Sequence, residues 1–326
     1  MQAHPMPPSR SHPAPVSHGA AVFVIAITAA IWGLSFPMTR LVLNSRISVG
    51  ALMSLRFTLA GAVMFAIIRG KRIPMVRRGL LDGLWLGLIL AVIFWLQIDG
   101  MRFTTTAKSG FITGLYVLFT PLVAFAIGQR IKLTSALGAV IATLGLYLLV
   151  RPAGGFGSGG LSLLTEVNRG DWETLLCAFL CGVHIVLMGA FVRRTDAWLL
   201  AGTQVMVCGM VAVAMSAFLP GQYGFHAVMQ ALSRVTVIGP ILYLALLSTV
   251  FAFWGQAVAQ TRLGPAEAAV LFCIEPVTAA ILSVFWLKEP MTASQAMGGA
   301  LIVLAMIVSE ALPYMFRAIT VPDTRP

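Results

Sequence analysis

Charged side chains are scarce in this sequence of 326 residues: Asp, Glu, Lys and Arg together make up only 10% of it. A soluble domain carries about 25% charged residues, which cover its surface. Hydrophobic residues make up 59% of the chain, and its mean hydropathy is +0.91. The shortage of charge therefore excludes a soluble protein and predicts an all-α integral membrane protein.

The sequence also lacks the residue clusters that catalysis or metal binding requires. It contains no HExxH, no GxSxG and no paired aspartates. Structural zinc needs about four ligands, but no His or carboxylate stands at ligand spacing beside the four cysteines: Cys177, Cys181, Cys208 and Cys273. We therefore predict no catalytic residue, no metal and no cofactor, with an intramembrane enzyme as a remote alternative.

Acidic side chains are fewer than basic ones, which gives a formal charge of +11. In a soluble protein such basicity would indicate a nucleic-acid partner. Here Lys and Arg cluster in short connections between apolar runs, where they orient membrane helices. The sequence therefore predicts no nucleic-acid partner.

Long apolar runs are what the chain does have. Runs of about 18–25 residues match the length that crosses roughly 30 Å of hydrocarbon as a helix. A membrane barrel would need short alternating segments instead. We predict ten transmembrane helices, at 20–42, 47–68, 79–101, 107–128, 133–150, 172–192, 197–219, 236–258, 265–287 and 292–312.

The polar segments set the predicted orientation and the division of the chain. We interpret residues 1–18 and 313–326 as polar tails. Connections on the cytoplasmic side of a membrane protein hold more Lys and Arg than those outside. The connections on the same side as the two tails are the more basic ones, above all RGKRIPMVRR at 69–78, so both tails are predicted to be cytoplasmic. The segment 151–171 contains a GxGxxG match, but that motif binds dinucleotides only between a strand and a helix. We interpret it as a Gly-rich linker.

The two halves of the chain repeat one another weakly. A shift of 159 positions lays FWLQ (94–97) on FWGQ (253–256), and a shift of 160 lays Gly138 on Gly298. A shift of 149 lays AAIWG (29–33) on AFLCG (178–182). Since five spans per repeat is an odd number, the copies insert with opposite orientation. The sequence predicts two inverted five-helix repeats, at 19–150 and 172–312.

Five short stretches are distinctive: WGLSFPMTR at 32–40, LRF at 55–57, TTAKSGFITGLYVLFTP at 105–121, PAEAAVLFCIEPVTAAILSVFWLKEPMT at 265–292, and the pair Gly298-Gly299. Through these stretches the chain resembles the EamA-type branch of the drug/metabolite transporter superfamily. The likeness covers about 20–312, nearly the whole chain.

The resemblance implies a ten-helix inverted repeat with a central cavity lined mainly by spans one, three, four, six, eight and nine. It implies a multi-pass protein of the bacterial inner membrane that moves small metabolites, often exporting amino acids and often coupled to protons. The chain departs from the family at Gln129, where many members carry a glutamate matching Glu289. A charge role for that position in the first repeat is not expected.

Two ionisable residues within spans are the candidates for proton coupling. Glu275 lies near the middle of its span, where a carboxylate is costly unless it faces protein or water. The alternative is a structural carboxylate bonded to a neighbouring helix. His184 titrates near neutral pH when unperturbed, and its alternative is a hydrogen-bonded core residue.

Aromatic and polar side chains recur in the spans that the resemblance places around the cavity. Aromatic rings with a few placed polar groups form small-molecule pockets, although an interfacial belt competes for Trp95. The predicted substrate-binding set is Trp32, Ser35, Phe36, Trp95, Gln97, Thr113, Tyr116, His184, Trp254 and Gln256.

Three further residues are predicted to be structural. Pro121 and Pro276 remove a backbone donor and can bend their helices. Arg56 could hold a substrate carboxylate, but we favour an ion pair or carbonyl contacts where helices pack, because span two is usually peripheral in the family.

Together these features predict a secondary transporter that exports an amino acid or a drug-like amphiphile by alternating access, with protons as a possible coupling ion. Its expected partners are a small-molecule substrate, the lipid bilayer and protons. The alternative is a sugar or lipid-linked substrate, and a more remote one is a membrane scaffold that transports nothing.

Overall fold

The computed structural model describes residues 16–104, 106–150, 168–218, 229, 233, 235–287 and 293–310, and its regular elements there are all helices. This confirms the predicted all-α class. The first half contains α1 (His18–Asn44), α2 (Val49–Gly70), α3 (Arg77–Gly100), α4 (Thr106–Gly114), α5 (Tyr116–Ala126) and α6 (Leu133–Val150). The predicted tails and the linker fall largely outside the described residues.

The second half contains a π-helix and a broken helix among its regular helices. It comprises α8 (Arg169–Phe191), α9 (Ala197–Phe218), α11 (Val235–Leu242), the π-helix η1 (Tyr243–Phe251), α12 (Ala252–Gln260), α13 (Pro265–Phe272), α14 (Ile274–Leu287) and α15 (Ala293–Glu310). The predicted span 265–287 breaks at Cys273, three residues before Pro276. Because proline cannot donate to the carbonyl one turn back, the break lies where the helix ladder is already interrupted.

Seven helical segments among the described residues are long and apolar enough to cross a membrane, and α6 and α15 contain shorter apolar stretches. The outside of the bundle is apolar as well: Phe125 is 71% exposed, Leu133 75% and Phe23 66%. Exposed large apolar side chains in such numbers are unsuited to water. The bundle therefore has the surface of a multi-pass membrane protein.

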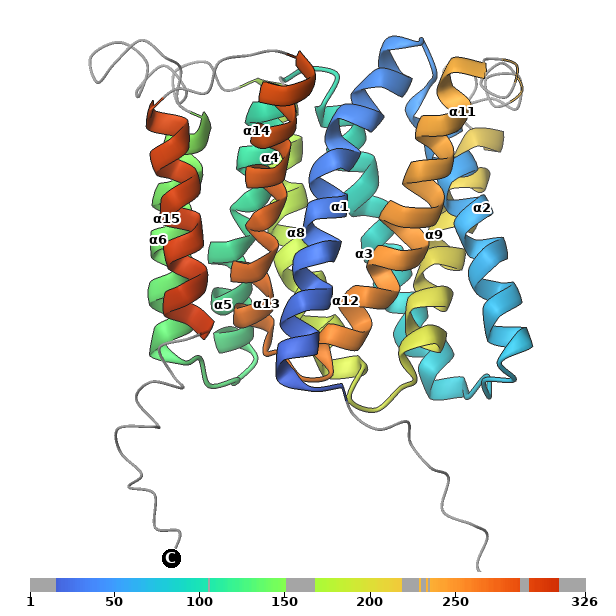
Figure 1. Ribbon diagram of the computed structural model, residues 1–326. Coiled ribbons are helices and arrows are strands. Elements are labelled where there is room, and N and C mark those ends of the chain that lie inside the picture. Colours follow the sequence, from blue (N-terminus) through green and yellow to red (C-terminus); the bar gives the residue numbers. More distant parts are fainter. Residues whose placement is uncertain are drawn as a thin grey trace, which may run out of the picture.

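Figure 1 shows the helices standing side by side, with the first turn of α1 and the last turn of α15 at the same end of the bundle. At one edge α6 and α15 are antiparallel. A Cβ added to Gly138 would lie 3.0 Å from the Ala305 carbonyl oxygen, and one added to Gly145 would lie 2.8 Å from the Gly298 carbonyl oxygen. The backbones therefore touch through glycines.

At the opposite edge α2 and α9 are also antiparallel (Figure 1). Near the start of α2, Ser54 Oγ donates to the Ala212 carbonyl over 3.0 Å. In the middle, Gly61 packs on Met206, and near the end of α2, Ile68 packs on Gly202. The contacting residue numbers rise along α2 while they fall along α9, as they must for two antiparallel helices.

A glycine stripe brings α3 against α9. Cβ atoms added at Gly79, Gly83 and Gly87 would lie 2.7, 2.5 and 2.6 Å from side chains of α9. Those side chains belong to Leu199, Thr203 and Val207, which repeat every fourth position as the glycines do. The spacing of small residues thus produces direct helix contact, as expected of membrane bundles.

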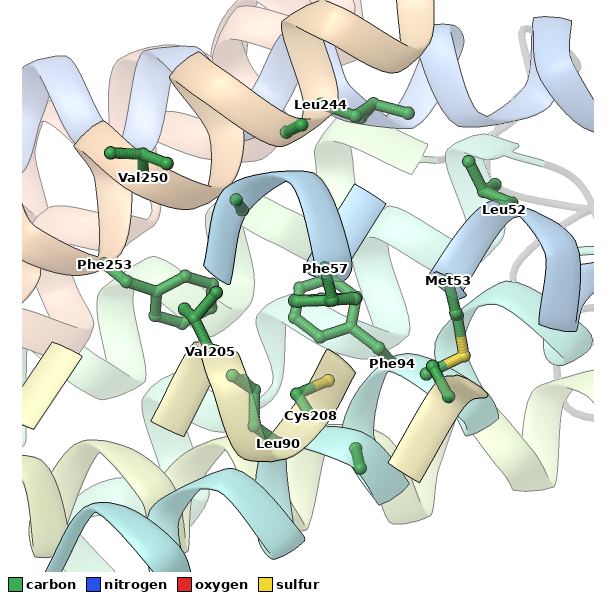
Figure 2. Close-up of a cluster of buried hydrophobic side chains, with 14 of the residues drawn as sticks. Leu52, Met53, Phe57, Leu90, Phe94, Val205, Cys208, Leu244, Val250 and Phe253 are labelled. Carbon is green, nitrogen blue, oxygen red and sulfur yellow. The ribbon is translucent and has the colours of Figure 1, made fainter. Parts of the chain in front are cut away.

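Two clusters of buried apolar side chains form the core. Figure 2 shows the first, in which α2, α3 and α9 contribute Phe57, Phe94 and Val205, with Phe253 from α12. The second lies among α1, α5, α6, α13 and α15. Trp32 packs against both clusters. The middle of α1 is therefore where the two parts of the core meet.

Ion pairs lie at the helix ends. Asp99 and Arg102 form one pair, with 2.8 Å between their charged atoms, and Arg169 joins it at 2.9 Å from Asp99. At the other end of α3, Asp82 pairs with Arg194 over 2.6 Å. The hydrogen bonds to the Asp82 carboxylate raise the pKa of Arg194 above its ordinary value.

Candidate functional site

A cavity lies inside the bundle where helices from both halves of the chain meet. Its volume is about 70 Å³, which is room for about five waters at about 10–15 Å³ each. Residues of α1, α2, α3, α4, α5, α8, α12, α13 and α14 line it. They are Trp32, Ser35, Arg56, Leu90, Ile93, Phe94, Gln97, Thr113, Tyr116, Cys181, His184, Ile185, Phe253, Gln256, Phe272 and Glu275.

Most residues of the predicted substrate-binding set face this cavity. Those that do are Trp32, Ser35, Gln97, Thr113, Tyr116, His184 and Gln256. Three do not line it: Phe36 is buried at 5% exposure, Trp95 packs against the first core cluster, and Trp254 stacks on Trp198 at 5.0 Å between ring centroids. The functional roles of all ten residues stay predictions.

Glu275 lies in the first turn of α14, next to the break at Cys273, and is 7% exposed. Its Oε2 accepts a hydrogen bond from the Tyr116 hydroxyl over 3.4 Å. Among the described residues no cation lies within ion-pair distance of its carboxyl group. The geometry therefore fits both interpretations, a carboxyl group bonded to a neighbouring helix and one that faces a cavity.

His184 also lies in the cavity wall, at 4% exposure. Its Nε2 donates to Gln204 Oε1 over 2.7 Å, and its ring stands edge-on to Phe253. The imidazole is thus held in one orientation by an amide from α9 and an aromatic ring from α12.

Two polar atoms at the cavity have no hydrogen-bond partner among the described residues. They are Gln256 Oε1 and Thr113 Oγ1. Gln256 Nε2 donates to Gln260, which in turn donates to the Ile185 carbonyl, so the amide is held by its nitrogen while its oxygen stays unpaired. Buried polar atoms are rarely left unsatisfied. Water or a bound solute in the cavity would satisfy both of them.

Three phenylalanines that the sequence prediction missed form an apolar wall of the cavity. The Trp32 ring lies 5.5 Å from that of Phe253 and 5.1 Å from that of Phe272, and Phe94 lies 6.1 Å from Phe253. A signal for two of them was present in the repeated tetrapeptides. In a helix, positions i and i+3 share a face, so the Phe of FWLQ and of FWGQ lies with the Gln, and the Trp does not.

Arg56 reaches the cavity from α2, at 2% exposure. This differs from the peripheral position expected of span two. Its Nε donates to Thr249 Oγ1 over 2.8 Å, and its Nη2 donates to Ser248 Oγ over 3.1 Å. The side chain therefore spans from α2 to the π-helix η1 along the cavity wall, and sequence alone could not show that reach.

Corresponding positions of the two halves line the cavity. The shift of 159 that aligns FWLQ with FWGQ pairs Phe94 with Phe253 and Gln97 with Gln256. The same shift pairs Tyr116 with Glu275, which are hydrogen-bonded to each other. With the shift of 149, Ser35 of α1 pairs with His184 of α8. The first two pairs are identical residues, whereas the two halves supply different chemistry at the other two pairs.

Comparison with known proteins gives the family. The sequence profile of the EamA-like transporter family matches the chain twice, at residues 19–151 and 168–310. An uncharacterized transporter of Archaeoglobus fulgidus is 26% identical over 285 residues, which are 87% of this chain and 83% of that protein. The uncharacterized transporter YdfC of Bacillus subtilis is 24% identical over 282 residues, covering 85% of this chain and 87% of its own.

A crystal structure with 21% sequence identity covers 92% of this chain and 99% of its own, with a TM-score of 0.67, so the two share a fold. The relatives are named as transporters, which points to transport rather than catalysis. The two family matches together span most of the chain, on both sides of the predicted linker. This chain belongs to the EamA-like transporter family.

Proposed function

We propose that the protein is a secondary transporter that exports a small metabolite, an amino acid or a drug-like amphiphile, by alternating access coupled to protons. The observation that carries the proposal is the cavity itself. It lies between the two halves of the chain, corresponding positions of both halves line it, and it contains one carboxyl group among its lining residues, Glu275. Transporters built from inverted repeats bind their substrates at this place.

The architecture that we propose is ten transmembrane helices in two inverted repeats, 19–150 and 172–312. Corresponding helices meet antiparallel in two places, α6 with α15 and α2 with α9. The shift of 160 aligns Gly138 with Gly298, and Gly145 with Ala305. In the structure each glycine of α6 contacts the residue aligned with the other glycine: Gly138 lies against Ala305, and Gly145 against Gly298. Contacts that exchange in this way support a two-fold axis in the membrane plane.

The helix breaks support alternating access. One lies at Leu115 between α4 and α5, and the other at Cys273 between α13 and α14. Tyr116 directly follows the first break, Glu275 lies two residues after the second, and both face the cavity. Discontinuous helices at the substrate site allow one half to move against the other, so the two segments are the expected hinges.

Glu275 is the proposed proton carrier, and His184 is the second candidate. Among the described residues, the one hydrogen bond to the Glu275 carboxyl group comes from a neutral hydroxyl, that of Tyr116. A carboxyl group without a cationic partner can gain and lose a proton without breaking an ion pair. The proposed location is the inner membrane with both tails in the cytoplasm, which the shared end of α1 and α15 supports.

The alternative cargo is a sugar or a lipid-linked substrate. An acyl chain would need an opening toward the bilayer, and the cavity is lined from nine helical segments around it.

Flux in proteoliposomes tests the function. Liposomes would be loaded with a pool of amino acids, given a proton gradient, and compared for the wild type, Glu275→Gln, His184→Gln and the control Glu173→Gln. Glu173 lies outside the cavity near the start of α8. We expect gradient-driven flux in the wild type and the control, and pH-insensitive exchange in Glu275→Gln.

Other outcomes separate the parts of the proposal. If Glu275→Gln responds to pH like the wild type, Glu275 is structural and His184 becomes the carrier to test. If no member of the pool moves in any protein, the amino-acid assignment fails, and sugars and lipid-linked solutes are assayed next. A protein that moves no solute of any class is not a transporter.

A further inference from the structure

One buried cation in the cavity wall has no acidic partner. Among the described residues no carboxylate lies within ion-pair distance of Arg56, while Asp82, Asp99 and Glu267 pair with cations at the bundle ends. Glu275 faces the same cavity, but its hydrogen bond is to Tyr116. A charge held inside a membrane bundle is costly and usually functional, so the charge of Arg56 calls for a counterpart.

The contacts of Arg56 engage Nε and Nη2 without neutralising the charge of the guanidinium. Nε donates to Thr249 Oγ1, and Nη2 donates to the side chain and, over 3.4 Å, to the carbonyl of Ser248. All three acceptors are neutral oxygens. Nη1 makes no hydrogen bond to a described residue, and guanidinium groups bind oxyanions best through adjacent N–H groups.

The groups that hold Arg56 are themselves held. Thr249 Oγ1 donates to the Leu244 carbonyl over 2.7 Å, which directs its lone pairs toward Arg56. The Ser248 carbonyl also accepts from Trp32 Nε1 over 2.9 Å. Because these bonds all come from the protein itself, they orient the guanidinium, which lowers the entropy lost on binding.

An apolar wall stands beside the cation. The guanidinium carbon lies 4.4 Å from the centroid of the Phe94 ring, and Figure 2 shows Phe94 beside Phe57 and, further along, Phe253. Phe253 in turn contacts Trp32. A solute that fits here carries its charge at one end and a flat apolar group at the other.

We propose that the cavity takes a small organic anion, a single carboxylate or comparable oxyanion attached to an apolar, preferably aromatic, body. Arg56 binds the anionic group through its Nη1 edge, and the rings of Trp32, Phe94 and Phe253 pack on the apolar body. As a statement about cargo, this assignment rests on the transport function proposed above. As a statement about binding, it stands on the geometry of Arg56.

Three probes with the same phenylethyl body test the charge preference on the unaltered protein. 3-Phenylpropionate, 3-phenylpropionamide and 2-phenylethylamine carry the same ring with an anionic, neutral and cationic end. Binding to the full chain in lipid nanodiscs would be measured by calorimetry, with empty nanodiscs subtracted. We expect the anion to bind about tenfold or more tightly than either of the others, because an unpaired buried charge discriminates strongly.

Variants then assign the preference to Arg56. Arg56→Gln is expected to lose the preference for the anion, and Arg56→Lys to keep part of it. Arg69→Gln, an exposed arginine near the end of the same helix, is expected to bind all three probes as the wild type does. Because the three-probe comparison uses the wild type, it holds even if Arg56→Gln does not fold.

The proposal is overturned if the amide binds as tightly as the anion, if the amine binds more tightly, if none of the three binds, or if a folded Arg56→Gln keeps the preference. The flux assay separates this result from the proposed function. A protein that prefers the anion but moves no solute keeps the site and loses the transport function. One that moves solute without preferring the anion keeps transport and loses the site.

Discussion

The contact between α1 and α14 makes Gly33 the position where one added methyl group should matter most for the cavity. A Cβ on Gly33 would lie 2.4 Å from the Glu275 carbonyl oxygen and 2.8 Å from Thr278 Cβ. A carbon needs about 3.3 Å to such an oxygen. In Gly33→Ala the two helices must therefore separate by about 0.9 Å, beside the break at Cys273.

The expected cost follows from this overlap. Overpacking by one methyl group in a rigid contact costs about 1–3 kcal/mol, and the atom met here is backbone, which cannot rotate away. A change of 1 kcal/mol shifts the unfolding temperature by about 2–4 °C in proteins somewhat smaller than this one. Because any Gly→Ala change in a helix also gains propensity, the comparison is with such a change made in open space, and Gly33→Ala should unfold at least about 2 °C below that control.

Gly19→Ala is the matched control, because it lies on the same helix with nothing within 4 Å of the added Cβ. It should equal or exceed the wild type, since alanine is favoured over glycine in a helix by about 1 kcal/mol. The assay is the loss of monodisperse protein on heating in detergent, at one heating rate because such unfolding is often irreversible. Equal midpoints for Gly33→Ala and Gly19→Ala would refute the packing argument.

The cavity and the ion pair at one end of the bundle give two further predictions. Cys181 lies in the cavity wall, and the other cysteines are buried. Methyl methanethiosulfonate, which labels thiols, should therefore lower solute flux in the wild type but not in Cys181→Ala. If Cys181 is labelled and the flux is unchanged, solute does not pass through this cavity. Arg194→Gln should lower stability by about 1 kcal/mol, a small value because the Arg194 side chain is 39% exposed beside the buried Asp82. The midpoint of thermal unfolding measures this loss of stability. An equal lowering of the midpoint in Arg193→Gln, which changes the exposed neighbouring residue, would contradict a specific role for the Asp82–Arg194 ion pair.

The helices were predictable because lipid leaves the backbone few alternatives. An apolar run of sufficient length must satisfy its own hydrogen bonds, and a helix does so within the segment. The break before Glu275 was foreshadowed by Pro276. The π-helix η1 was not predictable, because Thr249 Oγ1 bonds the carbonyl five residues back and also accepts from Arg56, a residue 193 positions away.

The cavity was predictable in its polar members and less so in its walls. The repeated tetrapeptides drew attention to Gln97 and Gln256, and both line the cavity. Of the three predicted tryptophans, Trp32 lines the cavity, but Trp95 and Trp254 do not, and Trp254 stacks on Trp198 instead. Arg56 could not be placed because its reach depends on how α2 packs against η1, which is a property of the whole bundle.

The cavity is symmetric in its positions and only partly symmetric in its chemistry, and a transporter has use for both properties. On the proposed inverted repeat, the inward and outward conformations exchange the roles of two similar halves, so neither conformation need lie far below the other. Two carboxylates in contact would resist ionising together and would titrate as a pair. Here Tyr116 stands where the repeat has Glu275, and the two are hydrogen-bonded. The pairing leaves one carboxyl group at this contact, held by a hydroxyl that can donate to its ionised form and accept from its protonated form. The difference between the halves is therefore what would let an otherwise balanced scaffold carry one proton in a defined place.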